Sequence, residues 1–277
     1  MVTLLQVKSH DNLSVTAIIP TFRSENVIIR ALNSVLNQTC PPNEVIIVDD
    51  ASDDQTVVVI REFMKNYPQI RLIVNSKNQG PGQSRNTAWH SATTEFIAFL
   101  DADDTWHPSK LGVQLEWFKQ NPRETICGTQ HRIFDQPEIA DATATVSNFT
   151  LKDLLHRNRF TTPSAMLRRE LSIKFDPKLR LSEDYLLWME IAATYGSINR
   201  INQTLTVLHK PAFGASGLSS KTFSMYVGEL KAINALVTKG HIGRTVFVRS
   251  ASWSTLKLIR RLPISVLRNI RWRYGGV

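Results

Sequence analysis

Short apolar runs alternate with helix-like segments along the first 120 residues of the chain. Continuous apolar runs at 15–19, 44–48, 70–74 and 95–100 predict strands that are buried on both faces. Helically spaced apolar residues, or helix start signals, mark the segments 24–38, 53–66, 84–91 and 108–120. This alternation predicts βαβ units and a mostly parallel sheet flanked by helices, which is an α/β fold.

The second half of the chain has a less regular pattern. Its apolar runs predict strands over 161–167 and 201–208, a helix over 183–193, and a helical segment over 231–277 that breaks at Gly240, Gly243 and Pro263. We see no internal repeat and no low-complexity linker. We therefore expect one domain over residues 1–230 and a helical C-terminal extension over 231–277.

Polar side chains follow three of the four strands predicted in the first half. Thr21 follows the first strand, Asp49-Asp50 the second, and Asp101-Ala102-Asp103 the fourth. In open α/β sheets, ligands bind outside the carboxyl ends of the strands. The sequence thus predicts a binding site at this edge of the sheet.

The run FIAFLDADDTW ends a buried strand in closely spaced carboxylates. Neighbouring carboxylates resist ionisation, so a positive partner is expected beside Asp101 and Asp103. A hard cation such as Mg²⁺ or Mn²⁺, shared with substrate phosphates, would supply that charge. The alternative is a solvated acidic turn that caps the next helix.

The Asp49-Asp50 pair suggests a carboxylate that accepts hydrogen bonds from a base or a ribose hydroxyl. The alternative is a helix N-cap, although Ser52 or Asp53 could fill that position. The first strand leads into Pro-Thr-Phe-Arg and not into a glycine-rich phosphate loop, which argues against a P-loop NTPase and a dinucleotide-dependent dehydrogenase. The turn Asn78–Gly82 would let a backbone approach a ligand closely.

The net charge of +9 is concentrated near the C-terminus. Ten of the 33 Lys and Arg residues, and none of the 24 Asp and Glu residues, lie after residue 230, which leaves a near-neutral body. Such an extension suits an anionic surface, whereas a nucleic-acid-binding domain would carry its excess in the body as well. Two cysteines give no disulfide framework, and the sequence shows neither a signal peptide nor an apolar run long enough to span a membrane.

Together, these segments resemble the family 2 glycosyltransferases, which have the GT-A fold. The resemblance rests on five segments in order, namely VTAIIPTFRSE, EVIIVDDAS, NQGPGQSRN, FIAFLDADDTWHP and LSEDYLLW. It covers about residues 14–195. It implies a nucleotide-binding half over about 14–120, with a Rossmann-like sheet, and an acceptor half over about 121–230.

The resemblance also implies a role for each matching position. In that pattern Pro20, Thr21 and Glu25 line the nucleotide, Asp50 with Asp49 reads the base, Arg85 lies over the nucleotide, Asp101 lies near the ribose, Asp103 ligates the metal, and Asp184 is the catalytic base. In an inverting transfer, a carboxylate accepts the proton of the acceptor hydroxyl, and a metal offsets charge on the leaving diphosphate. We thus expect Mn²⁺ or Mg²⁺ as cofactor. The alternative for Glu183-Asp184 is a pair of acids at a helix N-terminus capped by Ser182.

Two further residues follow the last predicted strand. In the resembled family this segment often folds over the diphosphate, so we expect His209 as a second metal ligand or phosphate contact and Lys210 as a contact to the nucleotide-sugar. The alternative is a surface histidine. Processive members carry Q-x-x-R-W after the base, but here only Arg268–Trp272 resembles it, with the wrong first residue and far from Asp184. Transfer of a single sugar is therefore expected.

The extension TLKLIRRLPISVLRNIRWRY keeps helical apolar spacing, interleaved with arginines and Trp272. Such a helix can lie on an anionic membrane surface, or it can pack on the domain with a solvated basic face.

The sequence therefore predicts a cytoplasmic glycosyltransferase, with the inner face of the membrane as a candidate location. We expect it to be metal-dependent and inverting, with a UDP-sugar as the favoured donor and a saccharide or lipid-linked acceptor in cell-surface polysaccharide synthesis. A sugar-nucleotide nucleotidyltransferase and a nucleic-acid-binding module acting through the extension are the alternatives.

Overall fold

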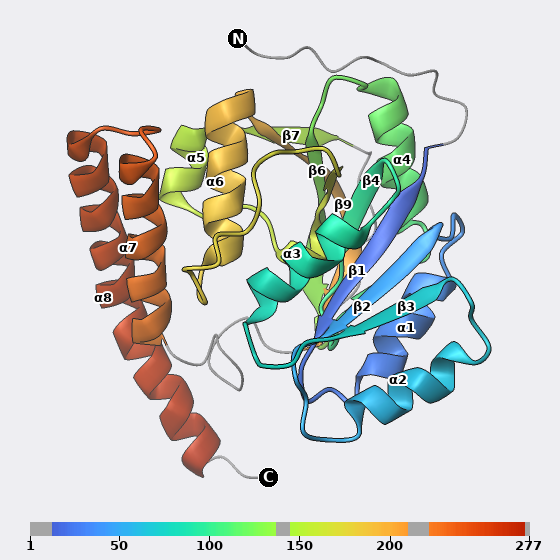
Figure 1. Ribbon diagram of the computed structural model, residues 1–277. Coiled ribbons are helices and arrows are strands. Elements are labelled where there is room, and N and C mark those ends of the chain that lie inside the picture. The colour runs from blue at the N-terminus through green and yellow to red at the C-terminus, as the bar shows by residue number, and fades with distance from the viewer. Residues whose placement is uncertain (1–12, 137–144, 210–221, 275–277) are drawn as a thin grey trace.

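The structure is a computed structural model that describes residues 13–136, 145–209 and 222–274, with side chains described up to residue 260 (Figure 1). The strands are β1 Val15–Thr21, β2 Glu44–Asp49, β3 Ile70–Val74, β4 Phe96–Phe99, β5 Thr105–Trp106, β6 Ile126–Ile133, β7 Val146–Phe149, β8 Met166–Arg168 and β9 Ile198–Leu208. The helices are α1 Ile28–Leu36, α2 Thr56–Met64, α3 Pro81–Ser91, α4 Lys110–Gln120, α5 Leu151–His156, the 3₁₀ turn η1 Thr162–Ser164, α6 Glu183–Tyr195, α7 Thr222–Thr238 and α8 Arg244–Tyr274.

The described strands form one mixed sheet in the order β3-β2-β1-β4-β8-β6-β9-β5, with β7 paired to β9. The four strands of the first half, β3, β2, β1 and β4, are all parallel, as the sequence predicts. The later strands pair mainly antiparallel, since β8 runs against β4 and β6, and β5 and β7 run against β9. The α/β expectation is confirmed. Among the described strands of the second half, β6 and β9 also pair parallel, and the other pairs there are antiparallel.

Helices cover both faces of the sheet, and each face has its own apolar core (Figure 1). Along β1, Ile18 enters the core that contains α3, α5, α6 and α7, whereas Ala17 and Ile19 enter the core that contains α1, α2 and α4. Successive side chains of a strand point to opposite faces, so a strand covered on both sides must be apolar throughout. This is why the first-half strands appear in the sequence as unbroken apolar runs.

Two predicted strands differ from the structure. The strand expected over 161–167 is instead the turn η1 followed by β8, because Pro163 lies within η1 and cannot donate a backbone hydrogen bond to a ladder. Strand β1 continues past its expected end through Pro20 to Thr21, paired with β2 alone beyond Ile18. Pro20 is tolerated there because no β4 partner needs its missing N–H.

The C-terminal helices also differ from the expectation. Position 230 lies inside α7, and Ala232, Ile233 and Leu236 of this helix are buried in the core shared with α6. A Cβ added at Gly228 would lie 3.0 Å from the Leu181 carbonyl oxygen, so this glycine permits close packing of α7 on the loop before α6. Helix α8 passes through Pro263 without ending, which makes the predicted break there wrong.

Within the described residues, none of the helices combines the length and the apolar character that crossing a membrane requires.

Candidate active site

The carboxyl ends of β1, β2 and β4 lie together at one edge of the sheet, because the three strands are parallel neighbours. Thr21 pairs with Asp49 in the register, and the backbone N–H of Asp50 donates to the Thr21 carbonyl at 2.8 Å. Thr21 is buried, and its Oγ1 has no hydrogen-bond partner among the described residues. Because buried polar atoms are nearly always hydrogen-bonded, this hydroxyl suggests a site that a ligand completes.

The two adjacent carboxylates of β2 hold the loops at this edge. Asp49 accepts hydrogen bonds from the backbone N–H and the hydroxyl of Ser52, at 2.9 and 2.6 Å. Asp50 accepts from the backbone N–H of Gly80 at 2.7 Å and from the Asn75 amide at 2.8 Å. The structure thus places both predicted base-reading residues at the edge, buried, with their carboxylates already bound to the protein.

The other residues expected from the strand-one segment lie close by. Pro20 is buried within β1, and Glu25 accepts a hydrogen bond from the Gln55 backbone N–H at 2.8 Å, at the start of α2. Glu25 therefore ties the loop after β1 to the helix after β2.

We call the sheet edge that carries Asp49, Asp50, Asp101 and Asp103 the acidic edge. The buried Arg85 of α3 forms ion pairs beside it. Its guanidinium donates to Asp101 at 2.6 Å and to Glu183 at 3.2 Å, and it packs over the Phe175 ring. Burial disfavours the charged form, but the two carboxylates outweigh it and raise the pKa of Arg85 above its ordinary value. Arg85, which the family resemblance placed over the nucleotide, is thus an ion-pair partner of Asp101.

Asp103 and His209 are neighbours at the next position along the edge. The Asp103 carbonyl accepts from Arg30 at 2.7 Å, and the charge of Asp103 acts on the His209 ring. His209 Nε2 lies 2.9 Å from Thr105 Oγ1, and the ring stacks on Phe134. Burial lowers the pKa of His209 below its ordinary value. The expected contact from Lys210 lies outside the described residues.

Asp184 is held at the N-terminus of α6, opposite the acidic edge. Ser182 precedes the helix with φ of 60°, an uncommon conformation for a residue with a side chain, and its hydroxyl accepts no capping hydrogen bond from the first turn of α6. The carboxylate accepts from the Tyr185 backbone N–H at 2.7 Å and faces the Thr162 hydroxyl at 3.4 Å. Burial raises the pKa of Asp184, which Arg85 partly opposes.

Glu183 points the other way, toward Arg85. A Cβ at Gly82 would lie 2.9 Å from Glu183 Cγ, so only glycine allows α3 to approach α6 this closely. Burial and the neighbouring Asp184 raise the pKa of Glu183. The two adjacent acids therefore have different surroundings, and it is Asp184 that lines the open cavity.

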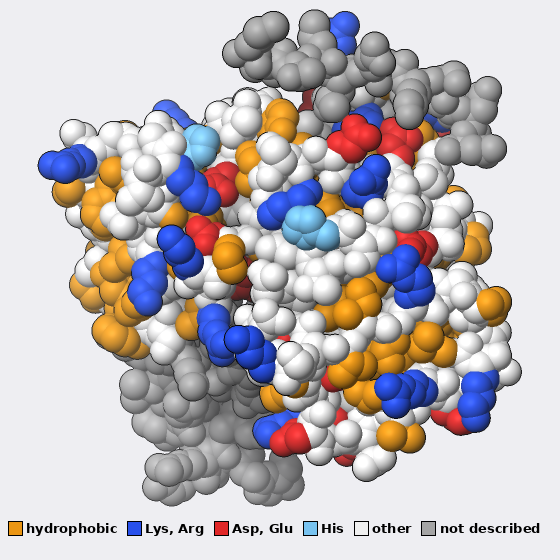
Figure 2. Space-filling view, viewed as in Figure 1, with side chains coloured by type: hydrophobic (Ala, Val, Ile, Leu, Met, Phe, Trp, Pro, Cys, Tyr) orange, Lys and Arg blue, Asp and Glu red, His pale blue; other side chains and the backbone are white. Residues whose placement is uncertain are grey.

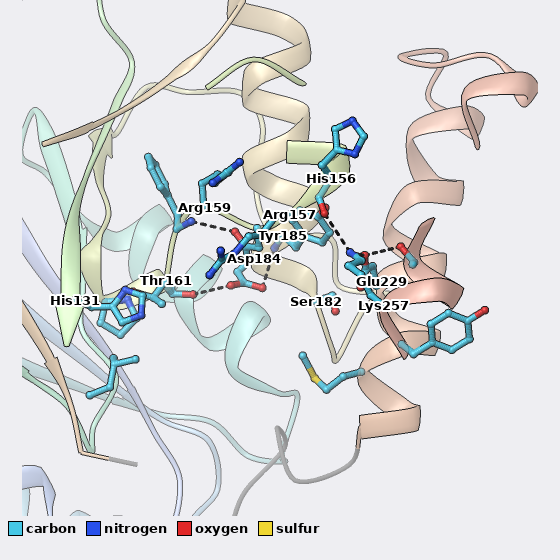
Figure 3. A pocket seen from close by; sticks show the side chains of 18 of the residues that line it. His131, His156, Arg157, Arg159, Thr161, Ser182, Asp184, Tyr185, Glu229 and Lys257 are labelled. Carbon is cyan, nitrogen blue, oxygen red and sulfur yellow. Dashed lines mark hydrogen bonds and ion pairs between the residues drawn. The ribbon is translucent and has the colours of Figure 1, made fainter. Parts of the chain in front are cut away.

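A cavity of about 1050 Å³ joins these parts, and Figure 3 shows Asp184 near its centre. One wall carries Asp101, Asp103 and Asp104. In Figure 3, Thr161 and His131 lie on one side of Asp184, and Glu229 and Lys257 from α7 and α8 lie on the other. The structure thus brings Asp101, Asp103 and Asp184 to one cavity.

The carboxylates fit a cation that is shared with a ligand better than one held by the protein alone. Among the described residues, no group of three or more His, Cys, Asp or Glu side chains could hold a metal ion. Mg²⁺ is usually held by one or two carboxylates plus water and substrate phosphates. Asp103, with Asp101 beside it on the cavity wall, supplies such a partial ligand set.

The sequence analysis missed the basic side of the cavity. Arg157 and Arg159, between α5 and η1, and Arg200 of β9 line it together with His131. They lie on three separate segments outside any recognised motif, so no spacing along the chain could group them. The roles of Glu183 and Arg85 as a buried pair were missed for the same reason.

Comparisons with known proteins agree with this geometry. The sequence model described as Glycosyl transferase family 2 matches residues 16–175. The Escherichia coli protein WfgD, named UDP-Glc:alpha-D-GlcNAc-diphosphoundecaprenol beta-1,3-glucosyltransferase, is 30% identical over 213 residues, which cover 77% of this chain and 82% of WfgD. TuaG of Bacillus subtilis (strain 168), a putative teichuronic acid biosynthesis glycosyltransferase, is 28% identical over 179 residues, covering 64% of this chain and 71% of TuaG.

Solved structures show the same fold. The S. aureus TarS 1-349 structure in complex with UDP-GlcNAc superimposes with a TM-score of 0.65 at 22% identity, covering 81% of this chain and 67% of that one. The mannosyltransferase PcManGT from Pyrobaculum calidifontis, in complex with GDP-Man and Mn²⁺, gives 0.66 at 19% identity, covering 95% and 76%. The expected GT-A architecture is confirmed.

Proposed function

Since the chain belongs to glycosyl transferase family 2, we propose that it transfers one sugar, with inversion, from a nucleotide-sugar to a lipid-linked saccharide. The observation that carries this proposal is the single cavity lined by Asp101, Asp103 and Asp184. A UDP-sugar is the favoured donor, in keeping with the names of WfgD and of the TarS complex. Membership of the family replaces both the nucleotidyltransferase and the nucleic-acid-binding alternatives.

The acidic edge is the donor side of this proposal. The nucleotide lies over Thr21, Asp49 and Asp50, where the unpartnered Thr21 hydroxyl is available to it. Arg85 positions Asp101 through the 2.6 Å ion pair. Asp103 would hold Mn²⁺ or Mg²⁺, with His209 beside it, and the cation would supply positive charge to the leaving diphosphate.

Asp184 is the general base. Its carboxylate accepts the proton of the acceptor hydroxyl while the oxygen attacks the anomeric carbon. The raised pKa supports this role, because a base is most effective when its pKa approaches the working pH. Thr162 and the Tyr185 N–H hold the carboxylate in place.

The acceptor would be reached from the inner face of the cytoplasmic membrane, as part of cell-surface polysaccharide synthesis. The outer surface of α8 supports this location, because the apolar side chains of Val248 and Ile259 are exposed there beside Arg249 and Arg260. Figure 2 shows hydrophobic side chains gathered over the helices α7 and α8, next to Lys and Arg.

Calorimetric titration of the full chain with UDP, GDP and CDP, each with Mn²⁺ and with EDTA, tests the donor side. We expect one nucleotide to bind only with metal, and Asp103→Ala to lose that binding. Asp53→Asn, at a surface ion pair with Arg23, is the matched control and should bind normally. Absence of binding by all three nucleotides, with and without metal, would falsify the proposal.

A further inference from the structure

The basic side of the cavity carries a cluster of arginines to which the proposed chemistry gives no role. We define the arginine cluster as Arg157, Arg159 and Arg200, all of which line the cavity. The guanidinium groups of Arg159 and Arg200 each lie 5.1 Å from the Phe149 ring centre, so one aromatic side chain holds them together. Figure 3 shows Arg157 and Arg159 beside Asp184.

These cations lack acidic partners. None of the three forms an ion pair with a described residue, whereas Lys257 on the opposite wall is paired with Glu229 at 2.5 Å. Among the described residues, the buried Arg159 Nε has no hydrogen-bond partner. Within the same part of the chain, the guanidinium of Arg200 reaches only the Asn202 amide oxygen, at 3.4 Å. Burial and the charges of Arg159 and Arg157 lower the pKa of Arg200, which indicates how close the three lie.

Such an arrangement favours a bound anion. Like charges gathered at a partly buried wall destabilise one another, and a ligand of opposite charge removes that cost. Arginine is the side chain best suited to phosphate, because its planar fork donates two parallel hydrogen bonds to phosphate oxygens. The cluster therefore has the chemistry of a phosphate or diphosphate subsite.

The position of the cluster assigns this phosphate to the acceptor. The donor's diphosphate belongs at the carboxyl ends of β1, β2 and β4, where Asp101 and Asp103 lie. The cluster instead comes from the α5–η1 segment and β9, in the second half of the chain. The acceptor hydroxyl must lie within hydrogen-bonding reach of Asp184, so the acceptor itself extends past this residue into the space that the arginines line.

An apolar groove opens from the cavity at His156, next to Arg157 in the chain. A second hollow of about 690 Å³ lies between α5 and α8, with Leu155, Val246 and Leu256 among its lining residues. His156 and Trp253 line both hollows, so the groove begins where the main cavity ends. Lys152 and Arg249 also line it, and both are exposed cations.

We propose that the arginine cluster binds the phosphate or diphosphate that links the acceptor saccharide to its lipid, and that the groove between α5 and α8 takes the first part of the hydrocarbon chain. This inference rests on the proposed glycosyl transfer and names the anchor of its acceptor. Arg157 directly follows His156, a residue that lines both the cavity and the groove, so Asp184, Arg157 and the groove follow the order of hydroxyl, phosphate and hydrocarbon in such a molecule.

The test is calorimetric titration of the full chain with farnesyl diphosphate, after saturation with Mn²⁺ and the nucleoside diphosphate that the donor titration identifies. Inorganic pyrophosphate supplies the charge without the chain, and farnesol supplies the chain without the charge. The variants are Arg157→Gln, which changes an exposed side chain and should fold, and Arg200→Gln. Arg61→Gln, an exposed arginine on α2, is the matched control. Circular dichroism checks the folding of each variant.

We expect farnesyl diphosphate to bind the nucleotide-loaded protein more tightly than pyrophosphate or farnesol does. Each cluster variant should weaken this binding about tenfold or more, the usual effect of removing a charge-assisted hydrogen bond, while Arg61→Gln leaves it unchanged. The nucleotide's own affinity should stay within twofold in every variant.

Other results would overturn the inference while leaving the proposed function intact. If bound nucleotide excludes farnesyl diphosphate, or if the cluster variants lose nucleotide affinity, the arginines belong to the donor. Equal binding of farnesyl diphosphate by variants and wild type removes the subsite, and equal binding of pyrophosphate and farnesyl diphosphate removes the groove. Failure of the proposed function itself would appear earlier, as no nucleotide binding.

Discussion

The acidic edge and the basic side of the cavity differ in whether their charged side chains have partners within the protein. On the acidic edge, each buried charge already has a protein partner, as in the Arg85 pairs with Asp101 and Glu183 and the Asp50 bonds to Gly80 and Asn75. On the basic side, the guanidinium groups of Arg157, Arg159 and Arg200 have no carboxylate partner among the described residues. A paired charge shapes a site, whereas an unpaired charge is available to a ligand.

The difference matches what each side has to do in the proposed reaction. The donor side is rigid, since its loops are fixed to parallel strands and its carboxylates are held by backbone N–H groups. The proposed acceptor side is built from the segment after α5, strand β9 and the helix pair α7 and α8.

The largest predicted effect is a loss of catalytic rate on substitution of Asp184, which lines the cavity between the acidic edge and the basic side. Asp184→Asn should lower kcat by about 10²- to 10⁴-fold, because the amide cannot accept the acceptor's proton. Nucleotide affinity should be unchanged. Steady-state kinetics with calorimetry separates the two effects, and Asp53→Asn is the control. A variant that keeps more than a tenth of the wild-type kcat would remove the base role.

The pH dependence of the wild type sharpens the same point. Because burial raises the pKa of Asp184, kcat should increase with pH through a value above the ordinary aspartate range near 4. A pH profile of kcat at saturating substrates measures this. An acid limb at or below pH 4 would contradict the buried environment seen here.

The next largest predicted effect concerns the contribution of the Arg85 ion pairs to the stability of the fold. Arg85→Met should destabilise the fold by about 3–5 kcal/mol, because it leaves the buried Glu183 and the partly exposed Asp101 without their cation. Urea unfolding at pH 7 measures it. Lys65→Met, at a surface ion pair with Glu62, is the control and should cost about 1 kcal/mol or less. If both variants lost the same free energy of unfolding, the buried ion pairs of Arg85 would contribute no more to stability than a surface pair does.

A smaller effect concerns the surface of α8 beyond the basic side. Ile259→Glu should weaken binding to anionic phosphatidylglycerol vesicles about tenfold, because it places a carboxylate on the exposed apolar face. Val58→Glu on α2 is matched to it, since the two side chains are 59% and 58% exposed. Vesicle sedimentation measures both. If neither variant matters, or if the wild type does not bind these vesicles, α8 does not contact lipid in this way.

The smallest predicted effect concerns Lys110 of α4, a buried lysine that forms no ion pair with any residue the structure describes. Burial lowers the pKa of Lys110, packed on Trp106, to about 7. The unfolded chain then binds more protons than the folded one between about pH 7 and 10.5, so stability should rise with pH there, by at most about 1.4 kcal/mol per pH unit. In Lys110→Met this slope should disappear.

Thermal unfolding at pH 7.5 and 9.5 measures the slope. Lys119→Met, an exposed lysine on the same helix, should keep the wild-type slope. A slope in Lys110→Met equal to that of the wild type would show that Lys110 is charged in the fold.

The sequence alone determined the first half of this protein. Its strands are buried on both faces, so their apolar runs are continuous and their ends are abrupt, and parallel order then brings Thr21, Asp49 and Asp101 to one edge. The strand over 70–74 agrees to the residue, and the helix containing Asp184 begins where predicted, at Glu183. The family resemblance followed from these same local segments.

Only the tertiary structure decided how the charges of the site are shared. Arg85 meets Glu183 across 98 residues of chain, and the arginine cluster joins β9 to the segment after α5, contacts that no local spacing records. The element bounds predicted for the second half were wrong for a related reason. Pro163 lies in the turn η1 and not in a strand, and the position of α7 is set by its packing on α6. Local periodicity reports which face of an element is buried, but the partner of a charge depends on which distant element reaches it.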